Sequence, residues 1–157
     1  MKKIVSINKA DNVTDMALLI ARVGIAALML THGIPKLLML LSGGPIQFPP
    51  MMGMSPELAL GLTVFAEVVC SILILTGFVT RLAAIPLIIT MLVAVIMVHG
   101  SDPIGIKEPA LHYLLVYIVL LLAGSGKYSV DYLLQGKKLN TNYAVKKVQD
   151  PTLAIYQ

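Results

Sequence analysis

The length, composition and charge of the sequence are those of a membrane protein. Its 157 residues are 57% hydrophobic and 13% charged, and the mean hydropathy is +0.86. A water-soluble domain of this size would carry roughly a quarter charged residues, so the composition excludes that class. The net charge is +4, and the basic residues gather near the ends of the apolar stretches. Membrane topology explains this distribution, so the charge does not call for a nucleic-acid partner. A single cysteine excludes a disulfide within one chain.

The apolar residues fall into four stretches, each close to the roughly 17–25 residues that a membrane-spanning helix needs. We therefore predict an all-α fold, an integral membrane four-helix bundle forming one domain over residues 1–157. The expected helices cover about residues 15–41, 56–78, 81–99 and 108–126, followed by a basic cytoplasmic tail over 127–157. The amino terminus begins like a signal peptide but lacks an apolar core, so we expect no cleavage.

Capping residues predict where the first two helices begin. Thr14 and Asp15 supply side-chain oxygens for the free amide groups of the first helix. Ser55, Pro56 and Glu57 combine a hydroxyl cap, a proline in the first turn and an acidic residue near the helix amino end. The second helix is therefore expected to start at this point.

The basic residues predict the orientation in the membrane. Lysines and arginines gather in the amino-terminal tail, at Arg81 in the turn between the second and third helices, and in the carboxyl-terminal tail. The two opposite loops, 42–57 and 99–108, have only Lys36 and Lys107 near their edges. The positive-inside rule then places both termini in the cytoplasm and both loops outside.

Glu67 lies near the middle of the second apolar stretch, roughly 15 Å from its start. A carboxylate at this depth is costly, so by default it indicates function and needs a partner. Arg22 is one candidate partner, although its long side chain could instead extend to the cytoplasmic interface. Lys36 lies fourteen residues further along the same helix, near the same face.

All three histidines fall in the outer half of the bundle under this orientation. They belong to the first, third and fourth helices, and Glu108 and His112 form an i, i+4 pair on the fourth. Each lies on an otherwise apolar helix, where a charge facing lipid would cost about 3 kcal/mol. We therefore expect an intramembrane polar site built from His32, Glu67, His99, Glu108 and His112, with Arg22 or Lys36 as counter-charge.

The spacing of these residues leaves the chemistry of the site open. Imidazoles can bind a metal or haem iron, or exchange protons near neutral pH, and above Glu67 they could hold a quinone. No HxxxH or HExxH pair stands on one helix, so no metal ligand and no catalytic residue is assigned. Met51, Met52 and Met54 are either soft Cu(I) ligands or flexible apolar filler. The simpler alternative is that the polar groups only cross-link helices, at about 0.6 kcal/mol per hydrogen bond.

Three segments carry a resemblance to a known family. They are Arg22-Val23-Gly24 with His32-Gly33-Ile34-Pro35-Lys36-Leu37; Glu67 with Leu75-Thr76-Gly77, Thr80-Arg81-Leu82-Ala83-Ala84, Met91, Ala94 and His99; and Glu108 and Tyr113 with Gly124-Ser125-Gly126-Lys127-Tyr128-Ser129-Val130-Asp131. Through these segments, which span roughly residues 15–135, the chain resembles the DoxX family of small four-helix bacterial membrane proteins. The last segment is the most specific, while Cys70-Ser71 stands where the family often has a glycine pair.

The resemblance implies a multi-pass protein of the bacterial inner membrane. Some family members look like subunits of thiosulfate:quinone oxidoreductases, and others are linked to membrane thiol or oxidative-stress systems. This favours a subunit or accessory of a membrane redox system that handles quinone, thiol or sulfur compounds. Its partners would then be the lipid bilayer and either a redox protein or further copies of the chain. The alternative is a non-enzymatic membrane scaffold, small-solute binder or stress-response protein. The chain has no flavin, iron–sulfur or dithiol motif, so enzymatic activity stays open, and quinone ranks ahead of metal or haem as a cofactor.

Overall fold

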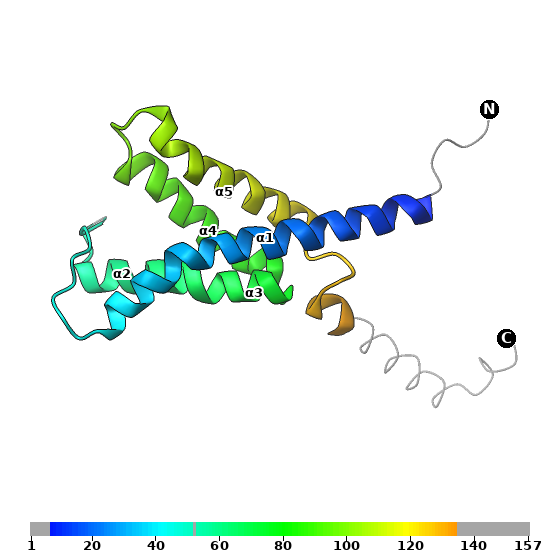
Figure 1. The fold of residues 1–157 in the computed structure, drawn as a ribbon, viewed down its shortest axis with the longest axis horizontal. Helices are drawn as coiled ribbons and strands as arrows, with labels where there is room; N and C mark the ends of the chain where they lie inside the picture. Colours follow the sequence, from blue (N-terminus) through cyan, green and yellow to red (C-terminus); the bar gives the residue numbers. More distant parts are fainter. Residues whose placement is uncertain (1–6, 52, 135–157) are drawn as a thin grey trace, which may run out of the picture.

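The structure, a computed structural model, describes residues 7–51 and 53–134 and contains no strand among them. The predicted all-helical fold is confirmed (Figure 1). The helical segments are α1 (Ile7–Leu41), α2 (Pro56–Val64), the π-helix η1 (Phe65–Cys70), α3 (Ser71–Thr76), α4 (Thr80–Val93), the π-helix η2 (Ala94–Val98) and α5 (Ile104–Ala123). Lys2, Lys3, Met52 and most of the predicted basic tail lie outside the described residues.

Four helices of the described chain are long and apolar enough to cross a membrane. They are Asn12–Leu41, Pro56–Thr76, Thr80–Val98 and Ile104–Ala123, where the second comprises α2, η1 and α3, and the third comprises α4 and η2. Apolar side chains such as Leu28, Leu82 and Leu122 are more than half exposed on their outer faces. In a bilayer these side chains meet lipid, so the molecule is a multi-pass membrane protein.

The first helix begins earlier than predicted, and the fourth covers Ile104–Ala123 instead of about 108–126. The first helix already includes Ile7, so Thr14 and Asp15 lie inside α1 and do not cap it. The Asp15 carboxylate instead accepts a hydrogen bond from Lys127 N, at 3.0 Å, from the far end of the chain. By contrast, the cap at Ser55 is confirmed, because its hydroxyl accepts from Leu58 N at 3.4 Å and Pro56 opens α2.

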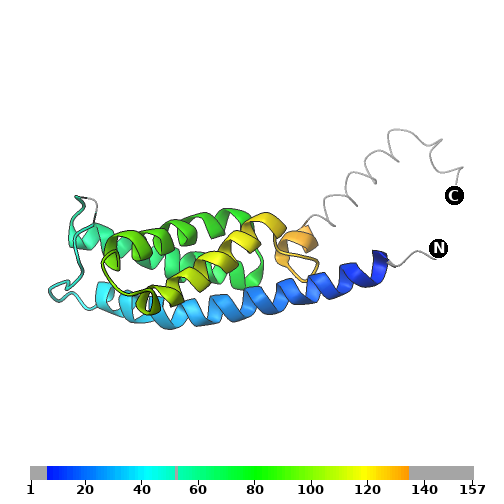
Figure 2. The ribbon, with the colours of Figure 1, turned by 90° about the horizontal axis from the view of Figure 1, so that it is seen from above.

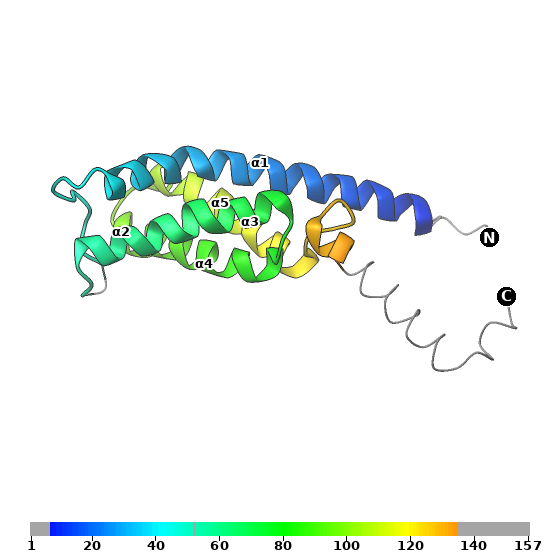
Figure 3. The same ribbon diagram turned by 90° about the horizontal axis from the view of Figure 1, so that it is seen from below.

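The bundle has two distinct ends (Figures 1 and 2). The loops over residues 42–55 and 99–103 lie at one end, which we call the loop end. The turn over residues 77–79 and the segment over residues 124–134 lie at the other, together with the amino-terminal part of α1; we call this the terminal end (Figure 3). The first and last described residues therefore lie on the same side of the bundle, as four spans require.

Small residues line the contacts between the helices. The core includes Ala26, Ala66, Ala83 and Ala84, all at most 3% exposed, around larger residues such as Tyr117. Lipid is as apolar as these side chains, so helices in a membrane associate through close packing and hydrogen bonds. Small side chains permit that close approach, and polar groups can then meet across the bundle.

Candidate functional site

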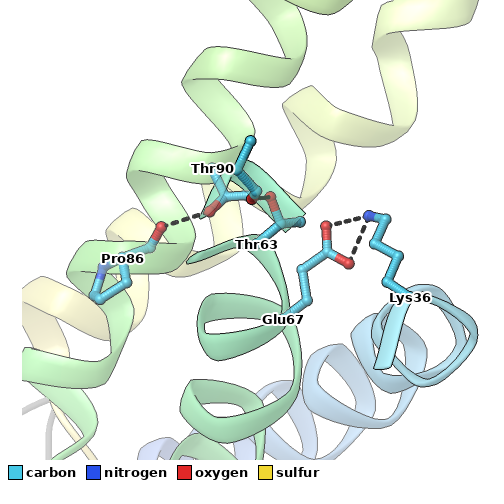
Figure 4. Close-up of polar contacts among 6 residues, drawn as sticks. Lys36, Thr63, Glu67, Pro86 and Thr90 are labelled. Atoms are coloured by element: carbon cyan, nitrogen blue, oxygen red, sulfur yellow. Dashed lines mark hydrogen bonds and ion pairs between the residues drawn. The ribbon is translucent and has the colours of Figure 1, made fainter. Parts of the chain in front are cut away.

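Glu67 is buried inside the bundle and paired with Lys36 (Figure 4). The Lys36 ammonium donates to both carboxylate oxygens, at 2.5 and 2.6 Å. The Glu67 side chain is 4% exposed and that of Lys36 is 30% exposed. The nearby hydroxyls of Thr63 and Thr90 donate to carbonyls of their own helices. Lys36 is therefore the counter-charge of Glu67, and its interaction joins α1 to η1.

The backbone around Glu67 is unusual in two ways. Glu67 lies in η1, and π-helical turns inside α-helices occur frequently at functional sites. Opposite it, α1 approaches so closely that a Cβ on Gly33 would lie 2.8 Å from Val68 Cγ2 and 3.0 Å from Glu67 Cβ. Only glycine fits this crossing without a shift of the neighbours. The close approach also places Lys36, about one turn further along α1, within reach of the carboxylate.

A cavity of about 200 Å³ opens beside the ion pair, and we call it the Glu67 cavity. All four membrane helices contribute to it. Its polar lining residues are His32, Lys36, Glu67, His99 and Tyr113, and its apolar ones are Met29, Met91, Ala94, Ile106, Pro109 and Ala110. The structure thus brings two of the three histidines to the buried carboxylate, together with a phenol.

Aromatic contacts link the cavity to the centre of the bundle. The rings of His32 and Tyr113 meet edge to face, with centroids 5.8 Å apart. Tyr113 in turn stacks on Tyr117, with centroids 6.2 Å apart. Tyr117 is fully buried, and its hydroxyl has no hydrogen-bond partner among the described residues. The polar lining therefore continues inward along α5.

Asp102 is a member of this region that the sequence reasoning missed. His99 follows η2 directly, and its Nδ1 lies 2.7 Å from Asp102 Oδ2. A carboxylate at this nitrogen fixes the ring orientation and leaves Nε2 for another partner. The signal was present as an i, i+3 His–Asp spacing immediately after an apolar stretch. We therefore assign Asp102 as the residue that orients His99.

Glu108 and His112 were predicted in the site, but neither lines the Glu67 cavity. Both side chains are exposed. Pro109 and Tyr113, each one position further along, line it instead. Glu108 and His112 share one face of α5, as their i, i+4 spacing predicts, but that face does not line the cavity. One residue rotates a helix by about 100°, so the positions directly after them belong to a different face.

Arg22 was the alternative counter-charge for Glu67, and the structure places it in another part of the bundle. It is 1% exposed and donates to Ser125 O, at 3.2 Å, and to Tyr128 O, at 2.5 Å. A Cβ on Gly77, whose φ is +71°, would lie 1.7 Å from Arg22 Nη1. Arg22 therefore holds the segment after α5 against the turn between α3 and α4 at the terminal end, and it does not pair with Glu67.

The segment over residues 124–131 completes this closure of the terminal end. The Asp131 carboxylate accepts from Val79 N at 2.8 Å and from Thr80 N at 3.4 Å, which caps the first turn of α4. Asp131 N donates to Gly77 O at 3.1 Å. Val79 has a φ of +50°, in the left-handed region that a β-branched residue rarely adopts, and these contacts hold it there. The start of the predicted tail is therefore a packed part of the bundle.

The described residues contain no group of three or more His, Cys, Asp or Glu side chains suited to hold a metal ion. Of the loop methionines considered as Cu(I) ligands, Met52 lies outside the described residues. Cys70 is a free thiol, buried in the core beside small residues.

These features define a class: a small multi-pass membrane protein whose four helices enclose a polar cavity at a buried ion pair. The DoxX family model matches residues 17–100, more than half of the chain, and the chain belongs to the DoxX family. The matched region contains four of the five polar lining residues of the Glu67 cavity and ends directly after His99, before α5 and the segment over residues 124–131. A search of curated proteins and a search of solved structures found no match.

Proposed function

We propose that the Glu67 cavity is the functional site, and that the chain is a membrane subunit or accessory of a redox system handling quinone, thiol or sulfur compounds. The observation that carries this proposal is the buried Lys36–Glu67 pair with a cavity open beside it. Ionisable groups at this depth are expensive and mark functional sites by default. A pair that served packing alone would need no space next to it.

The lining suits a ligand that accepts hydrogen bonds and exchanges protons. An ammonium group has three N–H donors, and Glu67 takes two of those on Lys36. The third remains for a ligand oxygen or a sulfur anion. His32 and His99 lie around the same space, where imidazoles can exchange protons, and Tyr113 adds a phenol that can donate or accept a hydrogen bond. The electrons would come from a partner protein, because the sequence has no flavin, iron–sulfur or dithiol motif.

The size of the cavity limits what it can hold. Its volume of about 200 Å³ is smaller than the roughly 300–1,000 Å³ of most ligand pockets. The cavity would therefore hold a small molecule or the polar ring of a larger one, whose apolar tail would stay in lipid. Met29, Met91 and Ile106 supply the apolar contacts for such a ring.

Quinone retention tests this proposal. The full-length protein is purified in mild detergent, and extracted quinone is measured by chromatography in parallel with the binding of a short-chain benzoquinone and of thiosulfate. We expect the wild type to bind one of these and Lys36→Met to lose it. Lys107→Met is the matched control, since Lys107, in the first turn of α5, donates to Gly100 O and does not line the cavity. If neither compound binds, or if all three proteins bind equally, the redox assignment is wrong.

The orientation is also a proposal. We infer that the terminal end faces the cytoplasm and the Glu67 cavity opens toward the outer half of an inner membrane. The support is that Arg22, Arg81 and Lys127 of the described residues lie at the terminal end, as the positive-inside rule expects. A redox protein would then be the partner that delivers or removes electrons, while a second copy of the chain would serve assembly only.

One observation favours the alternative of a non-enzymatic scaffold. The Lys36–Glu67 pair joins α1 to η1 where Gly33 brings them closest, so it can hold the helices together. In that case any cellular phenotype of Glu67→Gln would follow the amount of folded protein. A Glu67→Gln protein present at the wild-type level but without function would support the site and count against the scaffold.

A further inference from the structure

A second and larger cavity lies at the terminal end, and we call it the terminal cavity. Its volume is about 530 Å³, and none of its lining residues lines the Glu67 cavity. The walls come from the start of α4, the end of α5 and the segment that follows: Val79, Thr80, Arg81, Leu82, Ala123, Gly124, Ser125, Gly126, Asp131 and Tyr132. Its size is typical of ligand pockets.

The lining contains one cation and one anion, Arg81 and Asp131, and the Asp131 carboxylate also interacts electrostatically with the buried Arg22. No ion pair joins them, because the ion pairs among the described residues lie elsewhere. Arg81 donates one hydrogen bond, from Nη2 to Leu122 O at 3.1 Å, and a guanidinium has five N–H groups. Each Asp131 oxygen accepts one backbone N–H and has a further lone pair. Two opposite charges therefore face one space with hydrogen-bonding capacity left on both.

A buried hydroxyl in the same wall lacks a partner. Thr80 is 1% exposed, and its Oγ1 has no hydrogen-bond partner among the described residues. Leaving a buried hydroxyl unpaired costs about 1–3 kcal/mol. The oxygen itself is inaccessible, so the hydroxyl adds polarity to the wall without offering a direct contact to a ligand.

The depth of the cavity matches the headgroup layer of a bilayer. Two of the candidate spans meet here, since one begins at Thr80 and another ends at Ala123. The adjoining side chains of Leu82 and Leu122 are 65% and 73% exposed, so lipid tails can lie against them. Tyr132, half exposed in the same wall, is of the type that favours the membrane interface.

We infer that the terminal cavity binds the headgroup of a zwitterionic phospholipid that carries a phosphate and a primary ammonium group. The phosphate lies against Arg81, because a guanidinium fork matches phosphate oxygens. The ammonium lies against Asp131 and donates to its carboxylate. A purely anionic headgroup fits less well, since it would leave the carboxylate opposed to a like charge. This site is independent of the redox function proposed for the Glu67 cavity.

Lipid binding to the delipidated, full-length protein tests the inference. Native mass spectrometry in detergent measures the retention of phosphatidylethanolamine against phosphatidylcholine with identical acyl chains. Phosphatidylcholine has the same charges but no N–H donor for Asp131. We expect phosphatidylethanolamine to bind about tenfold more tightly, and Arg81→Gln to lose about tenfold of that affinity, as the loss of a charged hydrogen bond implies.

Two further variants and a soluble probe separate the outcomes. Lys107→Gln is the matched control, because this lysine also donates to one backbone carbonyl but lies at the loop end, and it should bind lipid like the wild type. Ala123→Leu keeps both charges and narrows the cavity, so it should weaken the binding of phosphatidylethanolamine even if Arg81→Gln does not fold. Equal binding of the two lipids, or full retention by Ala123→Leu, overturns the inference. Free glycerophosphoethanolamine binding as tightly as the lipid would show a soluble ligand and would overturn the lipid assignment.

Discussion

The Lys36–Glu67 pair can be tested by a double-mutant cycle, because both partners have uncharged substitutes of similar shape. Lys36→Met leaves the carboxylate without a partner at 4% exposure. Breaking a buried pair in this way costs about 3–5 kcal/mol. Glu67→Gln leaves a cation that is 30% exposed and can still be reached by water, so we expect a smaller cost of about 1–2 kcal/mol. The double variant contains no unpaired charge, and replacing a buried pair by neutral groups is often close to neutral.

Because the double variant is expected to lose little stability, the coupling energy in this cycle should be about the sum of the two single losses, roughly 4–7 kcal/mol. It is measured from the free energies of unfolding of the wild type, the two single variants and the double variant. Each protein is unfolded in mild detergent by adding increasing amounts of a denaturing detergent. Far-ultraviolet circular dichroism is the suitable signal, because the chain has no tryptophan. Lys107→Met is the control and should change stability by less than about 0.5 kcal/mol. A double variant that loses the full sum of the two single losses would show that the pair is not coupled and refute the reasoning.

Three further predictions use the same protein. Gly33→Ala should lose about 1–3 kcal/mol through overpacking, whereas Gly24→Ala, where a Cβ meets nothing within 4 Å, should not lose stability in the same unfolding assay. Gly77→Ala should unfold at least as easily as Gly33→Ala, because it combines a φ of +71° with a clash against a guanidinium. Cysteines at Ser42 and Ser101 should react with an impermeant maleimide from outside the cell, while a cysteine in the carboxyl-terminal tail should not; the reverse pattern would invert the proposed orientation. The native cysteine is buried and should add little background.

The number and position of the membrane helices could be predicted because hydropathy alone determines them. In a bilayer every backbone polar group must be satisfied within its own segment, so a long apolar stretch between loops can only be a helix. The rotation of each helix could not be predicted in the same way. A helix that is apolar on all sides has no polar face to set its orientation. On α5 the few polar side chains suggested the face of Glu108 and His112, whereas Pro109 and Tyr113 line the cavity.

The two π-helices are a second feature beyond sequence reasoning. Both border the Glu67 cavity, since Glu67 lies in η1, Ala94 begins η2, and His99 follows η2 directly. A π-turn accommodates one extra residue and so changes the direction of every side chain after it. Counting 100° per residue fails across such a turn. Because no residue type marks a π-turn, the local geometry of the cavity comes from packing between helices.

The contrast between Arg22 and Glu67 shows what separates a structural buried charge from a candidate site. Both are nearly inaccessible, at 1% and 3% exposure, and both lie on apolar helices. Arg22 donates to two carbonyls in the segment that follows α5, where helical bonding ends and backbone acceptors are left unpaired. Its surroundings are closed, with Gly77 packed against the guanidinium. Glu67 has a single described partner, Lys36, and an open cavity beside it. Burial alone does not distinguish the two charges. The open space next to Glu67 does, and for this reason we propose the Glu67 cavity as the functional site.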